Sequence, residues 1–352
     1  MKQGGGNIRE AALGNALQTL EEHLAAWRKS GGRDDVAVTI MALAVGAREM
    51  RNKIAVGPLL PGSSPDFQQH LDDDAVELFR GCLEQSPVAI VGTEKNETVK
   101  ILDASRRLAV AIDPLHGSSN IDTNLSTGTI FAIFPVPVSG VGGIETALMQ
   151  PGREQLAAGF FIYGPNAALV LTLRQGTHVF TLDPRDGHFY LTKSNLKVPE
   201  SGNEYSINAS NYRHWQRAIR DYIDDLIAGV SGPRGKDFNM RWSASMVAES
   251  YRILGRGGIY LYPRDSRPGY ESGRVGLICE ANPMALIFEE AGGGATDGVN
   301  RILDLVPTSL RQRVPLVVGS AEKVGRVARY FADAPAREQS SPLFNERGLF
   351  RV

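Results

Sequence analysis

Three short apolar runs that follow one another closely in the middle of the chain constrain its fold most. They cover residues 157–163, 168–173 and 178–182, and each has the length and the β-branched or aromatic content of a strand. The residues Pro184 to Gly187 then predict a tight turn that leads into another strand at 188–192. Strands joined by such short connections pair with their neighbours along the chain. The segment therefore predicts an antiparallel sheet.

Helical and strand patterns alternate on both sides of this segment. Residues 8–28 carry apolar residues at near-helical spacing, and Asp34 or Asp35 is placed to cap a second helix. A polar break at residues 196–204 divides the chain, so we expect a layered α/β fold with two subdomains. The expected subdomains are 1–198 and 199–335, followed by a tail at 336–352. Further helices are predicted at 67–85, 211–228, 243–254, 282–291 and 321–332, and further strands at 88–91, 108–112, 129–134, 258–262 and 314–318.

Composition limits the kinds of partner. The 352 residues include 38 basic and 39 acidic side chains, for a net charge of -1, so nothing favours nucleic acid or an anionic membrane surface. Cys82 and Cys279 are the two cysteines and make no disulfide framework, which fits a reducing cytoplasm. We also expect no signal peptide and no membrane span, since no apolar stretch reaches about 20 residues. The sequence thus predicts a cytoplasmic protein that acts on a small molecule.

The segment from Asp113 to Asp122 (DPLHGSSNID) carries the most chemistry. An acidic residue follows a predicted strand, Pro114 fixes a turn, and Gly117 opens a run of small residues. The backbone N–H groups and serine hydroxyls of such a run can hold a phosphate. Carboxylates hold hard divalent cations, which neutralise the charge of a phosphoryl transition state. A short D-P-x-x-G alone also fits a plain turn, but the longer run followed by Gly128–Phe131 is more specific.

This segment resembles the metal- and phosphate-binding signature of class I fructose-1,6-bisphosphatases. That family belongs to a superfamily of lithium-sensitive, metal-dependent phosphatases, and the similarity covers roughly residues 15–333. The resemblance implies the layered α-β-α-β-α sugar-phosphatase fold, with mixed and antiparallel sheets. Other stretches that carry it are 150–153 (QPGR), 206–208 (SIN), 245–248 (SMVA), 257–263 (GGIYLYP) and 280–285 (EANPMA).

The resemblance also implies a role for individual residues. Two or three Mg²⁺ ions per subunit are expected, with Asp72 and the loop residue Asp66 helping to hold a metal and orient the attacking water. Arg241 resembles an arginine that reaches into a neighbouring subunit's site, which implies a homo-oligomer; because the family is usually tetrameric, a homotetramer is expected. The implied metal ligands are Glu94, Asp113, the Leu115 carbonyl, the position of His116, and Glu280. The implied catalytic residues are Asp72, Asp66, Glu94 and Asn120, and the implied substrate contacts are Gly117, Ser118, Ser119, Asn208, Tyr212, Arg241, Tyr262 and Arg274.

Four residues depart from the family's pattern. His116 stands where an aspartate ligand is usual, and imidazole suits Mn²⁺ or Zn²⁺ better than Mg²⁺. Three outcomes are open for it: a retuned ligand, a hydrogen bond within the turn only, or a lost metal site. Lys95 replaces a second acid that helps to activate water, and a protonated lysine cannot act as that base. Gly276 and Cys279 stand where arginine and tyrosine are usual.

The expected reaction is metal-dependent hydrolysis of the 1-phosphate of fructose 1,6-bisphosphate, as in gluconeogenesis or the Calvin cycle. One alternative is a dual enzyme that also cleaves sedoheptulose 1,7-bisphosphate. Another is a catalytically impaired paralogue that only binds sugar phosphate. His116 and Lys95, which replace acidic residues of the family's site, are the evidence for this alternative. Strong inhibition by AMP is not expected, because the aromatic partner of the family's AMP site is missing beside Arg107 and Leu108.

Overall fold

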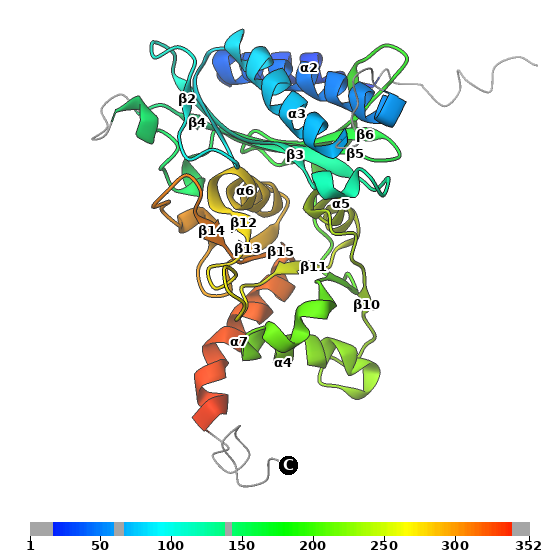
Figure 1. Ribbon diagram of the computed structural model, residues 1–352. Coiled ribbons are helices and arrows are strands. Elements are labelled where there is room, and N and C mark those ends of the chain that lie inside the picture. The colour runs from blue at the N-terminus through cyan, green and yellow to red at the C-terminus, as the bar shows by residue number, and fades with distance from the viewer. Residues whose placement is uncertain (1–16, 60–66, 138–142, 340–352) are drawn as a thin grey trace, which may run out of the picture.

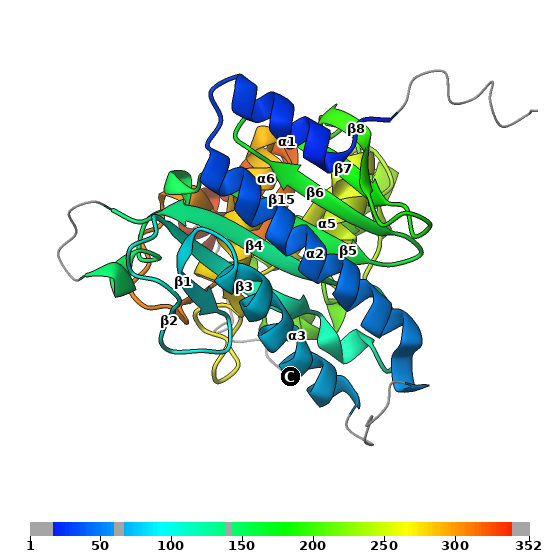
Figure 2. The same cartoon turned by 90° about the horizontal axis from the view of Figure 1, so that it is seen from above.

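Five layers of helix and sheet alternate in the computed structural model, which describes residues 17–59, 67–137 and 143–339 (Figure 1). Helices α1 (Leu20–Lys29), α2 (Asp34–Val56) and α3 (Phe67–Glu84) lie over one face of an eight-stranded sheet (Figure 2). Helices α5 (Met246–Arg256) and α6 (Asn282–Glu290) separate that sheet from a five-stranded one. Helices α4 (Arg217–Ile227) and α7 (Ala321–Gln339) cover the outer face of the second sheet. The α-β-α-β-α fold is confirmed.

The first sheet has the order β2-β1-β3-β4-β5-β6-β7-β8. Its neighbours pair antiparallel except for β1 and β3, so the predicted antiparallel hairpins are confirmed. Every residue of β5 is buried, because helices cover both faces of the sheet. The strands are β1 (Val88–Thr93), β2 (Lys100–Ile101), β3 (Leu108–His116), β4 (Thr127–Pro135), β5 (Ala157–Tyr163), β6 (Ala167–Thr172), β7 (Thr177–Leu182) and β8 (Phe189–Leu196).

The second sheet has the order β10-β9-β11-β15-β13, and β12 pairs separately with β14. Strand β8 ends at Leu196 and β9 begins at Glu204, so the polar break lies between the two sheets. The apolar faces of α5 and α6 pack against both sheets and join them through a shared core. The domain boundary at residue 198 stays a prediction. The strands are β9 (Glu204–Ser206), β10 (Asn239–Met240), β11 (Ile259–Tyr262), β12 (Val275–Gly276), β13 (Gly293–Thr296), β14 (Arg313–Val314) and β15 (Leu316–Ser320).

Capping residues set helix ends that the apolar pattern placed wrongly. The helix predicted at 8–28 begins at Leu20, because Thr19 and Glu22 form a capping box there; residues 8–16 lie outside the described residues. The helix predicted at 243–254 begins after Ser245, whose side chain accepts the N–H of Ala248. The helix predicted from residue 211 begins at Arg217, since residues 209–214 form a 3₁₀ turn.

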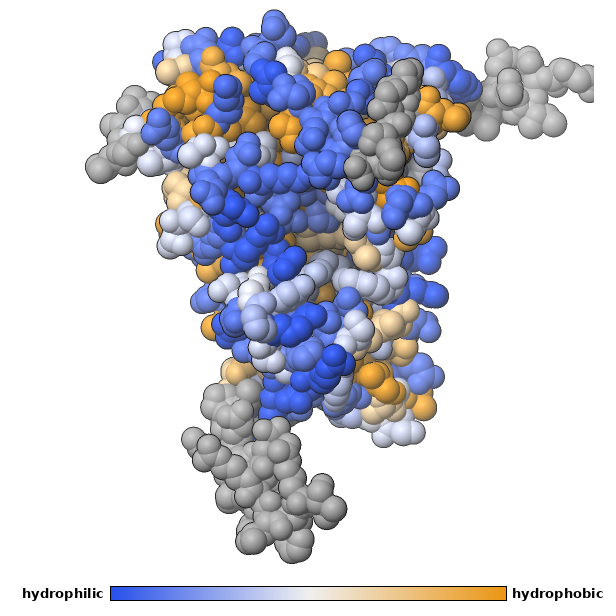
Figure 3. All heavy atoms as spheres, in the orientation of Figure 1, coloured by the Kyte–Doolittle hydropathy of each residue, from blue (hydrophilic) through white to orange (hydrophobic). Residues whose placement is uncertain are grey.

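Hydrophilic side chains cover most of the face shown in Figure 3. Among the described helices, none has both the length and the apolar character needed to cross a membrane.

Candidate active site

An irregularity in β3 brings the side chains of Asp113 and His116 together. Asp113 lies opposite Ile130 of β4 and His116 lies opposite Gly128. Between these pairs β3 therefore has one residue more than β4. The extra residue is a bulge, which re-aims the side chains that follow it. The strand was predicted to end before Asp113, but it continues to His116 through this bulge. As a result, Nδ1 of His116 lies 2.8 Å from Oδ2 of Asp113.

The turn after β3 forms one wall of the site. Gly117 adopts a left-handed φ of 73°, which favours glycine, and Ser118–Asn120 then form a 3₁₀ turn. Ser118 Oγ donates to Oδ2 of Asp72 over 3.1 Å, which joins α3 to this turn. The small-residue run predicted to face a phosphate is therefore fixed against the helix that carries Asp72.

Glu280 enters from the second half of the chain. It lies in a π-helical turn, Leu277–Ala281, that leads into α6. Its Oε1 is 3.1 Å from Nδ1 of His116, and its Oε2 accepts the N–H of Gly276 over 2.5 Å. An added Cβ at Gly276 would lie 3.0 Å from that Oε2, so a larger residue there would crowd the carboxylate.

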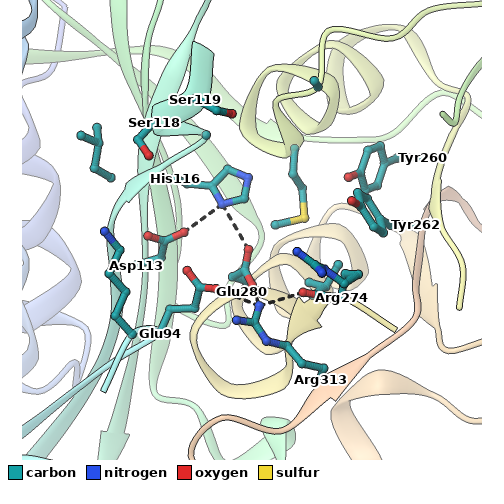
Figure 4. Close-up of a pocket in the computed structure, with 16 residues that line it drawn as sticks. Glu94, Asp113, His116, Ser118, Ser119, Tyr260, Tyr262, Arg274, Glu280 and Arg313 are labelled. Carbon is teal, nitrogen blue, oxygen red and sulfur yellow. Dashed lines mark hydrogen bonds and ion pairs between the residues drawn. The ribbon is translucent and has the colours of Figure 1, made fainter. Parts of the chain in front are cut away.

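Arg313 completes this group and was missed by the sequence analysis. The pairing of β12 with β14 places Arg313 opposite Gly276. Its Nη1 lies 2.8 Å from Oε1 of Glu94, which follows β1, and 3.7 Å from Oε2 of Glu280 (Figure 4). Nothing in the local sequence around Arg313 marks it as a site residue, because only the strand pairing brings it here.

The protonation of the site follows from this crowding. Burial opposes the charged form of His116, but hydrogen bonds and charges from Asp113 and Glu280 outweigh it and raise its pKa to about 10. Burial and the charges of Glu280 and Asp113 raise the pKa of Glu94, while Arg313 opposes the rise. The group thus holds carboxylates whose repulsion is relieved by basic side chains of the same chain.

These donors fit a divalent metal ion. Asp113, His116 and Glu280 each offer one ligand atom, and these atoms lie within 4.8 Å of one another. Two carboxylates and an imidazole form a mixed oxygen and nitrogen set, which suits Mn²⁺ or Zn²⁺ as well as harder cations. The geometry thus brings together three of the five metal ligands that the resemblance implies, and Glu94 and the Leu115 carbonyl are not part of this group.

A cavity of about 420 Å³ opens over this group (Figure 4). Aromatic rings form its far side, where Tyr260 stacks on Trp242 with ring centroids 6.2 Å apart. Ala244 also lines the cavity with a left-handed φ of 55°, a feature that the sequence did not predict. The sequence-predicted residues that line the cavity are Glu94, Asp113, Leu115, His116, Gly117, Ser118, Ser119, Tyr262, Arg274 and Glu280.

The other predicted site residues lie beside the cavity or apart from it. Asp72 is buried behind Ser118, and Lys95 Nζ lies 3.2 Å from its Oδ2. Asn120 is also buried, and its amide donates to the carbonyl of Ser243 over 3.3 Å. Asp66 lies outside the described residues.

The predicted sugar contacts are only partly brought together. Asn208 and Tyr262 line a smaller neighbouring hollow, so they adjoin the main cavity. The hydroxyl of Tyr212 instead donates to the carboxylate of Asp224 at 2.8 and 2.9 Å. Arg241 is 58% exposed, and its Nε lies 3.6 Å from Glu204, outside the cavity of its own chain.

Comparisons with known proteins find one family over most of the chain. The family described as fructose-1-6-bisphosphatase, N-terminal domain, matches residues 38–194, and its C-terminal domain family matches residues 198–332. The class 1 fructose-1,6-bisphosphatases of Sinorhizobium medicae and Rhizobium meliloti are each 50% identical over 345 residues, covering 95% of this chain and 99% of theirs. The holo-form crystal structure of Leishmania major fructose-1,6-bisphosphatase superposes with a TM-score of 0.83 at 31% identity, covering 90% of this chain and 99% of that one.

Proposed function

The chain belongs to the fructose-1,6-bisphosphatase family, and we propose that it hydrolyses the 1-phosphate of fructose 1,6-bisphosphate to give fructose 6-phosphate and phosphate. The observation that supports this most directly is the convergence of Asp113, His116 and Glu280 beneath a cavity lined by Gly117 and its serines. Neither a dual bisphosphatase nor an impaired sugar-phosphate-binding paralogue is favoured by the comparisons.

Different residues of the chain bind the phosphate, accept the proton of water and hold the sugar. The 1-phosphate lies against the Gly117–Ser119 turn, whose N–H groups and Ser119 hydroxyl hold its oxygens. Asp72 takes the proton of the attacking water, and Ser118 and Lys95 both engage its Oδ2. Tyr262 and Arg274 hold the sugar and its second phosphate from the opposite side of the cavity.

Metal binding rests on Asp113, His116 and Glu280. When bound, a divalent ion offsets the negative charge that develops on the phosphoryl oxygens. Because His116 supplies a nitrogen where an aspartate oxygen is usual in the family, we expect Mn²⁺ or Zn²⁺ to bind more tightly than Mg²⁺. His116 is therefore assigned as a retuned ligand.

Assembly is a further part of the proposal. Arg241 is exposed and lies outside its own cavity, as an arginine that enters a neighbouring subunit's site must. We propose a homo-oligomer on this ground, and a homotetramer because the family is usually tetrameric. We expect Arg241→Ala to raise KM for the bisphosphate more than it lowers kcat. The cytoplasmic location stays a prediction.

The test is phosphate release from fructose 1,6-bisphosphate by the purified protein with Mg²⁺, Mn²⁺, Zn²⁺ or a chelator. We expect metal-dependent turnover, and a shift of preference toward Mg²⁺ in His116→Asp. Binding of the bisphosphate without turnover under every metal would refute the catalytic proposal. Parallel reactions with sedoheptulose 1,7-bisphosphate measure whether the longer sugar is used as well.

A further inference from the structure

A second cavity, of about 460 Å³, lies at the start of helix α4 (Figure 1). Two segments of the second half of the chain, 213–220 and 264–271, contribute its lining. Their backbones are joined by an antiparallel bridge between Trp215 and Asp265. Backbone pairing therefore builds the walls of this cavity and fixes the side chains that face it.

Arginine side chains line this cavity without an ion-paired carboxylate among the described residues. The three are Arg213, Arg220 and Arg264. None of them makes an ion pair or a side-chain hydrogen bond with another described residue. Of the two acids in the lining, Asp265 accepts hydrogen bonds from Arg267 on both of its oxygens, so only Glu271 opposes the arginines. The lining, called the basic cavity below, therefore keeps a net charge of about two positive units.

The first turn of α4 adds to this positive character. The helix begins at Arg217, and the side chain of its N-cap residue, Gln216, makes no capping hydrogen bond. Gln216 itself lines the basic cavity. The N-terminus of a helix carries about half a positive charge and presents free N–H groups, and both favour an anion. An anion held by the arginines therefore also faces the start of α4.

The basic cavity adjoins the active site but does not open into it. Trp215 and Asp265 also line the small hollow that contains Asn208 and Tyr262. That hollow has a volume of about 10 Å³, which is room for about one water molecule. A ligand at the arginines therefore occupies a site of its own, next to the sugar end of the active site.

We propose that the basic cavity binds a phosphate group, carried by free phosphate or by a small phosphate monoester. The planar fork of an arginine matches the oxygens of a phosphate, and its charge is permanent. Such a group carries about two negative charges at neutral pH, which balances the lining. The volume of the cavity also leaves room for a short organic chain. The site does not depend on the proposed function, because its lining residues differ from those of the active-site cavity.

The test is isothermal titration calorimetry of the full chain, freed of metal and then of chelator by dialysis. Inorganic phosphate is titrated in one series and glycerol 3-phosphate in another, and their affinities distinguish free phosphate from a monoester. The wild type should bind at least one of the two. Arg213→Met/Arg264→Met should weaken this binding by about tenfold or more, because charge-assisted hydrogen bonds to phosphate are lost. Both arginines are exposed, so the variant should fold.

Matched variants separate this site from general effects of charge and from the active site. Arg217 lies one turn before Arg220 on α4, but it pairs with Asp221 at 3.7 Å and does not line the cavity, so Arg217→Met should keep the affinity. Arg274→Met removes a cation from the active-site cavity and should keep this binding too. Arg220→Met provides a second test at the cavity itself, and thermal unfolding without ligand shows that each variant is folded.

The proposal is overturned if the wild type binds neither ligand at millimolar concentration, or if the folded double and Arg220→Met variants bind as tightly as the wild type. It is also overturned if Arg217→Met weakens binding equally, or if Arg274→Met alone abolishes it, since the ligand would then lie in the active site. Phosphate release from fructose 1,6-bisphosphate, measured separately, keeps the two proposals apart. A wild type that binds the ligand but has no phosphatase activity removes the proposed function and leaves this site.

Discussion

Replacing His116 with aspartate should destabilise the metal-free protein and make its stability depend on Mg²⁺. The imidazole now lies 2.8 Å from Asp113 and 3.1 Å from Glu280, and the substitution puts a third carboxylate in its place. Two like charges about 4 Å apart repel by about 4 kcal/mol at an effective dielectric constant of about 20. Because side chains can rotate apart, we expect a net loss of about 3–5 kcal/mol.

The assay is thermal unfolding in the presence of a chelator and then with Mg²⁺. The expected loss corresponds to a fall in Tm of roughly 5–10 °C for the variant in chelator. Mg²⁺ should restore much of it, since an ion present at 100 times its Kd stabilises the folded state by about 2.7 kcal/mol. The wild type should respond less to Mg²⁺, because it presents one fewer oxygen ligand.

His188→Asp is the matched control. His188 also contacts a carboxylate, Glu21 at 3.3 Å, but its side chain is 48% exposed, so the same substitution should cost less than about 1 kcal/mol. The reasoning is refuted if His116→Asp and wild type unfold at the same temperature in chelator, or if Mg²⁺ raises both Tm values equally.

Two further predictions concern packing and pH. Gly159→Ala should destabilise by about 1–3 kcal/mol or more, because the new Cβ would lie 2.5 Å from the ring of Phe131. Gly81→Ala in α3, with nothing within 4 Å, should instead stabilise by up to about 1 kcal/mol; urea unfolding of both variants checks the pair. Burial, and to a smaller extent the charge of His178, lower the pKa of His23 to about 4. As the pH falls, the unfolded chain therefore binds a proton at this residue before the folded chain does, and the free energy of unfolding decreases between pH 6.5 and 4. Between pH 7 and 4.5 the free energy of unfolding should fall by about 1–2 kcal/mol less in His23→Gln than in the wild type, after a discount for the partial exposure of the side chain.

The parts of the site that lie in one stretch of sequence could be predicted from it. The run from Asp113 to Ser119 carries its own turn chemistry, and it forms the cavity wall that was expected. Glu94 and Glu280 were expected at the site from the family resemblance, and both line the same cavity.

What escaped prediction depends on pairing between distant segments. Arg313 enters the site only because β14 pairs with β12, and the bulge at Asp113 becomes visible only against β4. The same holds for the start of α4 at Arg217, since the apolar spacing upstream does not distinguish an α-helix from the 3₁₀ turn that is present. Periodicity reports which face of an element is buried, but not which distant residue covers it.

The departures from the family's pattern make better sense together than singly. By the resemblance, His116 in place of aspartate removes one negative charge, and Lys95 in place of an acid adds two positive units. Gly276 in place of arginine removes one positive charge, so the three changes make the site more positive by two units, the charge of one divalent ion.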